Sequence, residues 1–146
     1  MALICCDTSF LFSVYGKDGF TPQAVTELRG LGSVLSVSVL NDFELENSVR
    51  LAVFRRLRNL AQANIILAEY AEDISVGRLV LETCNLAMVV AEAKRLAVTH
   101  TLTGGRRSFD ILHVAAALHL GAREFLSFDA NQRKLAKVEG LKIRPV

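Results

Sequence analysis

The chain has 146 residues, of which 51% are hydrophobic, and a formal net charge of +2. This size and composition favour one globular domain over residues 1–146 and exclude a disordered chain. No apolar run reaches the ~18 residues of a membrane span, and no basic segment followed by a signal-like apolar region begins the sequence, so we expect a soluble, cytoplasmic protein. Cys5, Cys6 and Cys84 lack a metal-binding spacing and are interpreted as small buried hydrophobic residues.

Charge is unevenly distributed along the chain. Residues 1–48 are acidic overall, residues 49–61 hold four arginines and no acid, and residues 104–146 carry eight basic and four acidic side chains. Acids gathered in a cleft with arginines at its rim would suit a metal site that faces a phosphate chain. A mixture of solvated surface charges would give the same pattern, so composition leaves both interpretations open.

The first predicted element is a strand, Leu3–Cys6, which ends at Asp7 and is followed by a short helix over residues 10–14. An unbroken apolar run can be buried on both faces, as parallel strands are. Asp7 then lies at the carboxyl edge of the sheet, where open α/β sheets bind their ligands. Aspartate is also an ordinary helix N-cap, so a purely structural role for Asp7 stays open at this point.

Residues 16–38 predict a loop, a helix and a second strand. Residues 16–19 form the loop, Thr21 and Pro22 begin a helix that ends at Gly30, and residues 34–38 form the strand. Strand, helix and strand in this order imply two parallel strands with a right-handed crossover.

A long helix is predicted over residues 42–61, capped by Asn41 or Asp42. Glu44 falls in its first turn, where it can be a favourable charge at the helix N-terminus, an exposed residue or a functional acid. Arg55 and Arg58 are three residues apart and share its more exposed face.

The middle of the chain predicts a helix over residues 63–71, a short edge strand over residues 78–82 and a helix over residues 85–100. Residues 101–107 contain two glycines and two arginines and predict a basic loop.

The segment over residues 108–118 is the most informative one. Ser108 is the predicted cap of a helix that is nearly all small and apolar, so this helix is packed on most sides. The ~0.3–1 kcal/mol that a helix dipole supplies would offset little of the cost of burying the Asp110 charge, whereas a bound cation would offset more. His113 is interpreted as a hydrogen-bonded core residue rather than a metal ligand.

The chain closes with a strand over residues 124–128, a helix over residues 132–138 and a strand over residues 141–144. Asp129 repeats the position of Asp7, directly after a buried strand and before a helix. In a parallel sheet both acids then lie at the same edge.

Four acids thus fall at strand ends or in first helical turns, where they can converge: Asp7, Glu44, Asp110 and Asp129. Close carboxylates repel one another and raise one another's pKa unless a cation is present. Mg²⁺ and Mn²⁺ prefer oxygen ligands, so this acid set favours them over zinc. Such a site could polarise a phosphoryl oxygen and activate a water for phosphodiester hydrolysis.

In the order and spacing of these motifs the chain resembles the PIN-domain family, and most closely its VapC-like toxin ribonucleases. The resemblance covers nearly the whole chain and rests on Asp7-Thr8-Ser9, Glu44-Leu45-Glu46-Asn47, residues 108–117, and Ser127-Phe128-Asp129. It implies a three-layer α/β/α domain with a central, mainly parallel sheet. It also implies a Mg²⁺- or Mn²⁺-dependent endoribonuclease acting on single-stranded or structured RNA, which forms a homodimer and is blocked by a cognate antitoxin.

The resemblance carries roles onto matching residues. It makes Asp7, Glu44, Asp110 and Asp129 the catalytic acids, the three aspartates being metal ligands. Glu46, two residues after Glu44, is the alternative site acid.

Other positions match more loosely. Ser9 matches a hydroxyl that supports the metal site, and candidate RNA contacts are Arg106, Arg107 and the Arg55/Arg58 face. Asn131 stands where many relatives carry a further acid, which leaves open whether one or two metal ions bind.

Other α/β families fit less well. A haloacid-dehalogenase-like phosphatase would need an Asp in place of Ser9, a receiver domain needs a lysine after a late strand, and a dinucleotide fold needs a glycine fingerprint. The remaining alternative is a PIN fold that serves as an RNA- or protein-binding scaffold with little or no catalysis. The presence of all four acids argues against it.

Overall fold

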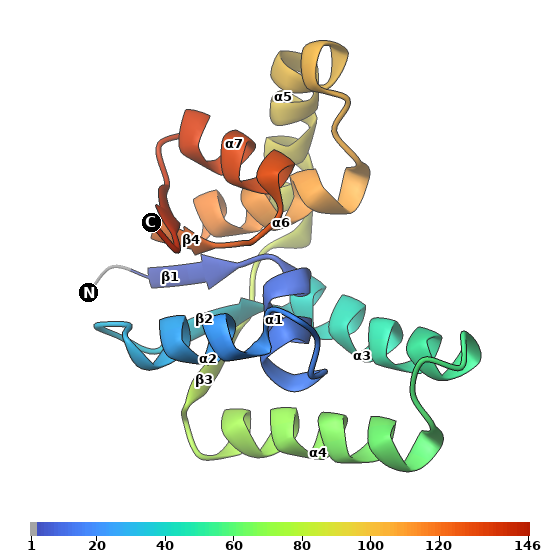
Figure 1. Cartoon of the computed structure of the whole chain (residues 1–146). Coiled ribbons are helices and arrows are strands. Elements are labelled where there is room, and N and C mark those ends of the chain that lie inside the picture. Colours follow the sequence, from blue (N-terminus) through green and yellow to red (C-terminus); the bar gives the residue numbers. More distant parts are fainter. Residues whose placement is uncertain (1–2) are drawn as a thin grey trace.

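The computed structural model describes residues 3–146, which form a five-stranded parallel sheet with helices on both faces (Figure 1). The strand order is β3-β2-β1-β4-β5. The predicted α/β class is therefore confirmed, as is the placement of the third strand at a sheet edge. The strands are β1 (Leu3–Cys6), β2 (Leu35–Ser38), β3 (Leu79–Glu82), β4 (Ala122–Leu126) and β5 (Lys142–Arg144).

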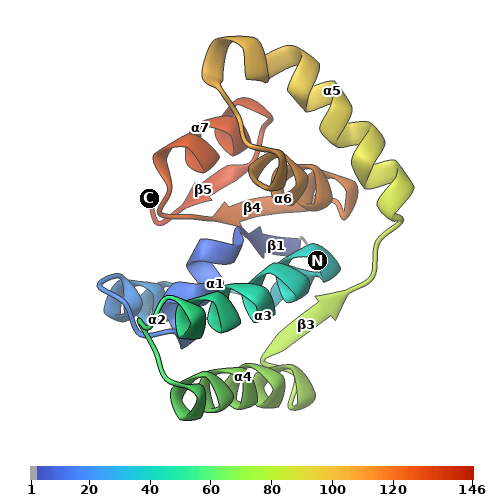
Figure 2. The same cartoon turned by 90° about the vertical axis from the view of Figure 1, so that its right-hand side faces the viewer.

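Two helical layers enclose the sheet. Helices α1 to α4 cover one face and α5 to α7 cover the other, and the chain passes between the layers after β3 (Figure 2). The helices are α1 (Thr8–Tyr15), α2 (Thr21–Arg29), α3 (Val39–Phe54), α4 (Leu60–Ser75), α5 (Leu86–Gly104), α6 (Ser108–His119) and α7 (Ala130–Val138).

The apolar strands feed both cores because successive side chains of a strand point to opposite faces. Ile4 and Cys6 of β1 pack with the α1–α4 layer, whereas Cys5 packs with the α5–α7 layer. In β4, Leu126 and Phe125 divide in the same way. A central strand of this kind must be apolar without interruption, which is the pattern that the sequence shows.

The cysteines follow the prediction in part. Cys5 and Cys6 are buried free thiols, and burial raises the pKa of Cys5 to about 12 and that of Cys6 well above its ordinary value. Cys84 is only partly buried, so its predicted burial is wrong. Along residues 3–146, none of the helices is both long and apolar enough to cross a membrane.

The predicted long helix is wrong at both ends. Helix α3 starts at Val39 because Ser38, rather than Asn41 or Asp42, caps it, and Asn41 completes the capping box. It ends at Phe54, and Arg56 takes a left-handed conformation with φ of 60° in the turn to α4. Asn59 then caps α4 with a second capping box.

This turn changes the interpretation of two arginines, because Arg55 and Arg58 do not share a helical face. Arg58 donates to the backbone carbonyls of Gly16 and Lys17 at 2.7 and 2.9 Å. Its guanidinium therefore joins the α3–α4 turn to the α1–α2 loop, and the predicted RNA-binding face of Arg55 and Arg58 is not formed.

Other boundaries differ by a few residues. Helix α5 continues through the predicted loop to Gly104 and ends at the left-handed Gly105. The N-cap of α6 is Arg107, not Ser108. Strand β4 covers Ala122–Leu126, so Asp129 is the third residue after the strand rather than the first.

Candidate functional site

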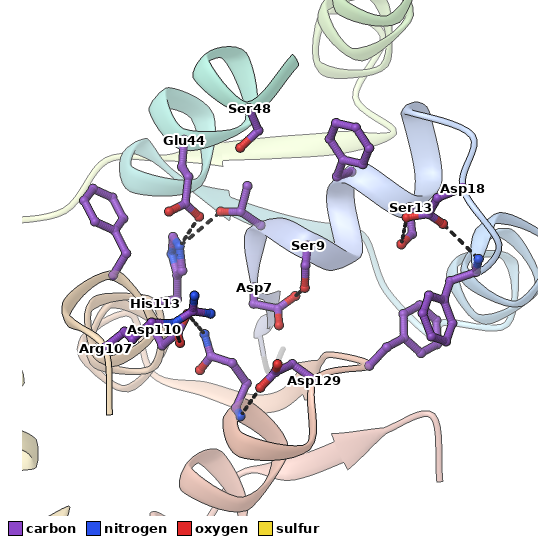
Figure 3. A pocket seen from close by; sticks show the side chains of 16 residues that line it. Asp7, Ser9, Ser13, Asp18, Glu44, Ser48, Arg107, Asp110, His113 and Asp129 are labelled. Carbon is purple, nitrogen blue, oxygen red and sulfur yellow. Dashed lines mark hydrogen bonds and ion pairs between the residues drawn. The ribbon is translucent and has the colours of Figure 1, made fainter. Parts of the chain in front are cut away.

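A pocket of about 630 Å³ opens at the carboxyl ends of the central strands, and all four predicted acids line it. They come from four elements: Asp7 follows β1, Glu44 lies on α3, Asp110 lies on α6, and Asp129 is the N-cap of α7 (Figure 3). The parallel sheet brings them together because the carboxyl ends of its strands meet at one edge.

Asp7 is both a helix cap and part of the pocket, so the two interpretations of this residue do not exclude each other. Its Oδ1 accepts hydrogen bonds from the Phe10 backbone at 2.8 Å and the Ser9 hydroxyl at 3.0 Å. Its Oδ2 accepts one from the Ser127 hydroxyl. Asp7 is only 2% exposed, and desolvation raises the pKa of its carboxyl although these three hydrogen bonds oppose the rise.

Glu44, rather than Glu46, faces the pocket. Desolvation alone would raise the pKa of Glu44, but hydrogen bonds from His113 and Thr8 outweigh it, and the pKa lies below its ordinary value. Glu44 is therefore ionised at neutral pH. Glu46 lies outside the pocket lining and pairs with Arg50 at 3.7 Å.

His113 is buried and holds Glu44 in place. The Asn41 amide oxygen accepts from the Ser38 backbone at 3.1 Å, which turns the amide nitrogen toward His113 Nδ1 at 3.2 Å. That ring nitrogen is consequently an acceptor, so the proton resides on Nε2, which donates to Glu44 Oε1 at 2.8 Å. His113 is thus a hydrogen-bonded core residue, as the sequence predicts, and it also orients a pocket acid.

Gln132 connects the other two acids and is a residue that the sequence analysis missed. Its backbone N–H donates to Asp129 Oδ1 at 2.9 Å and its side-chain amide donates to Asp110 Oδ1 at 3.4 Å. The side chain is 2% exposed, and among the described residues its Oε1 has no hydrogen-bond partner. A buried carbonyl oxygen without a partner is costly and suits a site that a ligand or an ordered water completes.

The comparison with known proteins agrees with this geometry. The sequence matches the family model of the PIN domain over residues 4–138. The chain belongs to the PIN-domain family. No curated protein sequence matches this PIN domain.

Solved structures resemble this PIN domain over nearly its whole length. VapC20 of Mycobacterium tuberculosis, described as a Sarcin-Ricin loop cleaving toxin, is 17% identical with a TM-score of 0.69, covering 97% of this chain and 99% of that one. VapBC2 of Rickettsia felis, bound to a promoter DNA fragment, has 15% identity, a TM-score of 0.66 and 97% coverage of both chains. FitAcB of Neisseria gonorrhoeae has 18% identity, a TM-score of 0.63, and coverage of 97% and 96%. At these identities the likeness shows a shared fold and nothing further.

The donor atoms of this PIN domain fit a hard cation by type. They are carboxylate oxygens and the free Oε1 of Gln132, whereas both ring nitrogens of His113 are engaged in hydrogen bonds. Oxygen donors of this kind suit Mg²⁺ or Mn²⁺ rather than zinc. Within residues 3–146, no three Asp, Glu, His or Cys side chains lie close enough together to hold one ion. Binding would therefore require side chains such as Asp110, which now contacts Arg107 and Gln132, to rotate.

The two arginines before α6 have different surroundings. Arg107 lines the pocket and pairs with Asp110, with 3.1 Å between Nε and Oδ2. Arg106 lies outside the pocket lining and donates to the Asn131 carbonyl at 3.0 Å. Of the two, Arg107 has the position that suits contact with a phosphate.

A fifth acid, Asp18, also lines the pocket and was missed by the sequence analysis. It lies in the α1–α2 loop, where its Oδ2 accepts from the Ser13 hydroxyl at 2.9 Å (Figure 3). An Asp-Gly pair in a loop indicates only a turn, so the sequence carries no signal for this position. Gln132 does carry one, because its spacing from buried Leu135 and Ala136 places it on the inner face of α7.

Proposed function

We propose that this PIN domain is a metal-dependent endoribonuclease that hydrolyses phosphodiester bonds of RNA as the toxin of a toxin–antitoxin pair. The observation that carries the proposal is the meeting of Asp7, Glu44, Asp110 and Asp129 in one pocket at the carboxyl edge of a parallel sheet. Family membership and the VapC-like fold support it.

In this proposal Asp7, Asp110 and Asp129 hold Mg²⁺ or Mn²⁺, and Ser9 supports Asp7 through its hydrogen bond of 3.0 Å. A bound divalent ion supplies Lewis-acid polarisation of a phosphoryl oxygen and lowers the pKa of a water. Glu44, ionised and fixed by His113, would orient the attacking water.

Arg107 contacts the phosphate backbone in this proposal. Its side chain is largely exposed at the pocket, and a guanidinium matches phosphate oxygens in charge and geometry. Arg106 assists indirectly, because its hydrogen bond to Asn131 fixes the segment before α6 against α7.

The proposed partners are a cognate antitoxin and a second copy of the chain. Structural neighbours were crystallised as VapBC2 and FitAcB, which supports a cognate antitoxin as a partner. For the homodimer we propose the surface of α3 and α4, where exposed apolar side chains gather: Leu51, Phe54, Leu60 and Ile65.

The decisive experiment incubates the purified protein with a set of labelled RNAs in Mn²⁺ or Mg²⁺, in EDTA, and with the Asp110→Asn variant. We expect metal-dependent cleavage that EDTA abolishes and that Asp110→Asn reduces by at least a hundredfold while the protein stays folded. Glu46→Gln is the matched control, because it also neutralises an acid, one that lies two residues after Glu44 but outside the pocket lining. An Asp110→Asn protein as active as its parent would contradict the site assignment.

The second candidate is a PIN-fold scaffold that binds RNA or protein with little catalysis. One observation favours it: in the described part of the chain no three potential ligands cluster around a single point. The same experiment separates the two, because a scaffold would bind RNA without cutting it and would show no Mn²⁺ binding by calorimetry.

A further inference from the structure

We propose that the exposed ring of Phe20 is a stacking platform for an unpaired nucleobase at the rim of the acidic pocket. The inference rests on the proposed function, because it names how that site recognises single-stranded RNA. Phe20 lines the pocket and is 50% exposed, so one part of its ring faces solvent beside the acids.

Phe20 is the outermost member of a row of three rings. Its ring lies almost parallel to that of Phe128, with centroids 4.8 Å apart and planes 14° apart. Phe128 in turn packs on Phe10, with centroids 5.5 Å apart and an angle of 30°. Phe10 is fully buried, so the row runs from the core to the surface. Phe128 packs against Phe20 on the side that faces the core.

Hydrogen bonds fix the loop that carries Phe20. The Asp18 carboxylate accepts from the Phe20 backbone N–H at 2.8 Å and from the Ser13 hydroxyl at 2.9 Å. The Asp18 backbone N–H donates to Thr21 Oγ1 at 2.9 Å. A ring that is already held in position loses little conformational freedom when a base stacks on it.

The platform lies beside the proposed chemistry. Phe128, on which Phe20 stacks, directly precedes Asp129 in the chain, and Arg107 lines the same pocket. A cationic contact for phosphates combined with an aromatic face for bases is how proteins bind single strands, since every base has a π-face. A double helix hides those faces, so this arrangement selects unpaired nucleotides.

A second aromatic pair near the pocket lacks this geometry. Phe43 and Phe109 have centroids 6.5 Å apart and planes inclined at 37°. Phe43 also lies outside the pocket lining. The parallel pair of Phe20 and Phe128 therefore offers the better surface for stacking.

The test measures binding of a short single-stranded RNA with 2-aminopurine at successive positions, in the Asp110→Asn background so that cleavage does not interfere. Fluorescence quenching reports stacking of the probe base, and a second RNA carries an abasic site in its place. The variants are Phe20→Leu, which keeps an apolar side chain, and Phe20→Tyr, which keeps an aromatic face. Phe43→Leu is the matched control, because Phe43 is 61% exposed and outside the pocket lining.

We expect Phe20→Leu to weaken binding by roughly five- to a hundredfold and to abolish quenching at one position, since base–aromatic stacking has about that value. Phe20→Tyr should retain the quenching, and the abasic RNA should bind parent and Phe20→Leu alike. Equal binding by Phe20→Leu and Phe43→Leu would overturn the inference. So would a Phe20→Leu protein that binds RNA normally but loses a protein partner in size-exclusion chromatography.

If the parent cleaves RNA and Phe20→Leu is unaffected, this inference alone fails, whereas a parent that neither cuts nor binds RNA removes the proposed function as well.

Discussion

Asp7 combines a helix cap with a buried charge, and these two properties have opposite effects on stability. Asparagine is as good an N-cap as aspartate and needs no charge in the core. We therefore predict that Asp7→Asn raises the melting temperature at neutral pH, by ~2–4 °C for each kcal/mol of burial cost removed, and abolishes RNA cleavage. Thermal unfolding followed by circular dichroism, together with the cleavage assay, tests both parts.

The pH dependence of this difference has a definite sign. Burial raises the pKa of Asp7, so the folded chain binds the proton more tightly than the unfolded chain does. The stability contribution of Asp7 is then fully retained below its unfolded pKa and is lost as the pH rises through its folded pKa. The advantage of Asp7→Asn should accordingly vanish in acid, and Mn²⁺ should stabilise the parent but not the variant. A variant that melts below its parent at neutral pH would show that the charge is stabilised by contacts other than those seen.

A substitution of Gln132 should affect metal binding without lowering the stability of the fold. Its Oε1 is buried without a partner among the described residues, and its bond to Asp110 is long at 3.4 Å. Gln132→Met removes that unpaired oxygen and keeps an unbranched side chain of similar length, so we predict a melting temperature equal to or above that of the parent. Mn²⁺ affinity, titrated by electron paramagnetic resonance, should fall roughly 10–100-fold, as for other residues that orient metal ligands. Unchanged Mn²⁺ affinity would restrict Gln132 to a packing role.

At the scale of elements, the order of strands and helices follows from the sequence, but several boundaries do not. The break between α3 and α4 contains neither glycine nor proline, and arginine and leucine are good helix formers, so the pattern predicts that the first helix continues to residue 61. The chain turns there because Arg56 adopts a left-handed conformation and Arg58 donates hydrogen bonds to a loop 41 to 42 residues away in sequence. Contacts of that range are outside what local propensity can predict.

The same distinction separates predictable from unpredictable site residues. Asp7 and Asp129 could be predicted because a buried strand and a following helix fix their place at one sheet edge. Asp18 reaches the pocket only through the fold of a loop, held by Ser13 and the Phe20 backbone. Ser127 is recognised as a site residue only from the structure, in which its hydroxyl at the end of β4 donates a hydrogen bond to Asp7 at the end of the adjacent strand β1.

Arg58 gives a prediction about how two elements are joined. Its guanidinium donates to Gly16 and Lys17, so Arg58→Ala leaves these carbonyls without their charged donor. We predict a loss of ~1.5–3 kcal/mol in the free energy of unfolding and faster hydrogen exchange in residues 16–19. Arg55→Ala removes an equal charge from an exposed neighbour and should change neither quantity. Equal effects of the two substitutions would mean that Arg58 acts only through net charge.

For the molecule as a whole, the strand order explains where the pocket lies. Strand β1 is central, the chain moves outward through β2 and β3, and it then returns to the other side of β1 with β4 and β5. The helices change faces at the same reversal (Figure 2). Side chains from both layers therefore line the pocket at the carboxyl end of β1. Open α/β sheets bind ligands at such a switch point. Acids that are distant in sequence therefore share one pocket, and the cationic Arg107 lines it with them.

This distribution of charge leads to a prediction about salt. Neutralising a phosphate of a single strand changes the slope of log K against log salt by ~0.7. If Arg107 contacts a phosphate, Arg107→Gln should weaken RNA binding across sequences and make the slope shallower by ~0.7–1. Binding would be measured by fluorescence anisotropy in the Glu44→Gln background with Mn²⁺, because Arg107 pairs with Asp110 and that acid must stay intact. Arg123→Gln is the control, since it removes an equal charge from an exposed residue near the start of β4, away from the carboxyl edge of the sheet. Identical slopes for the two variants would mean that Arg107 acts only through overall charge.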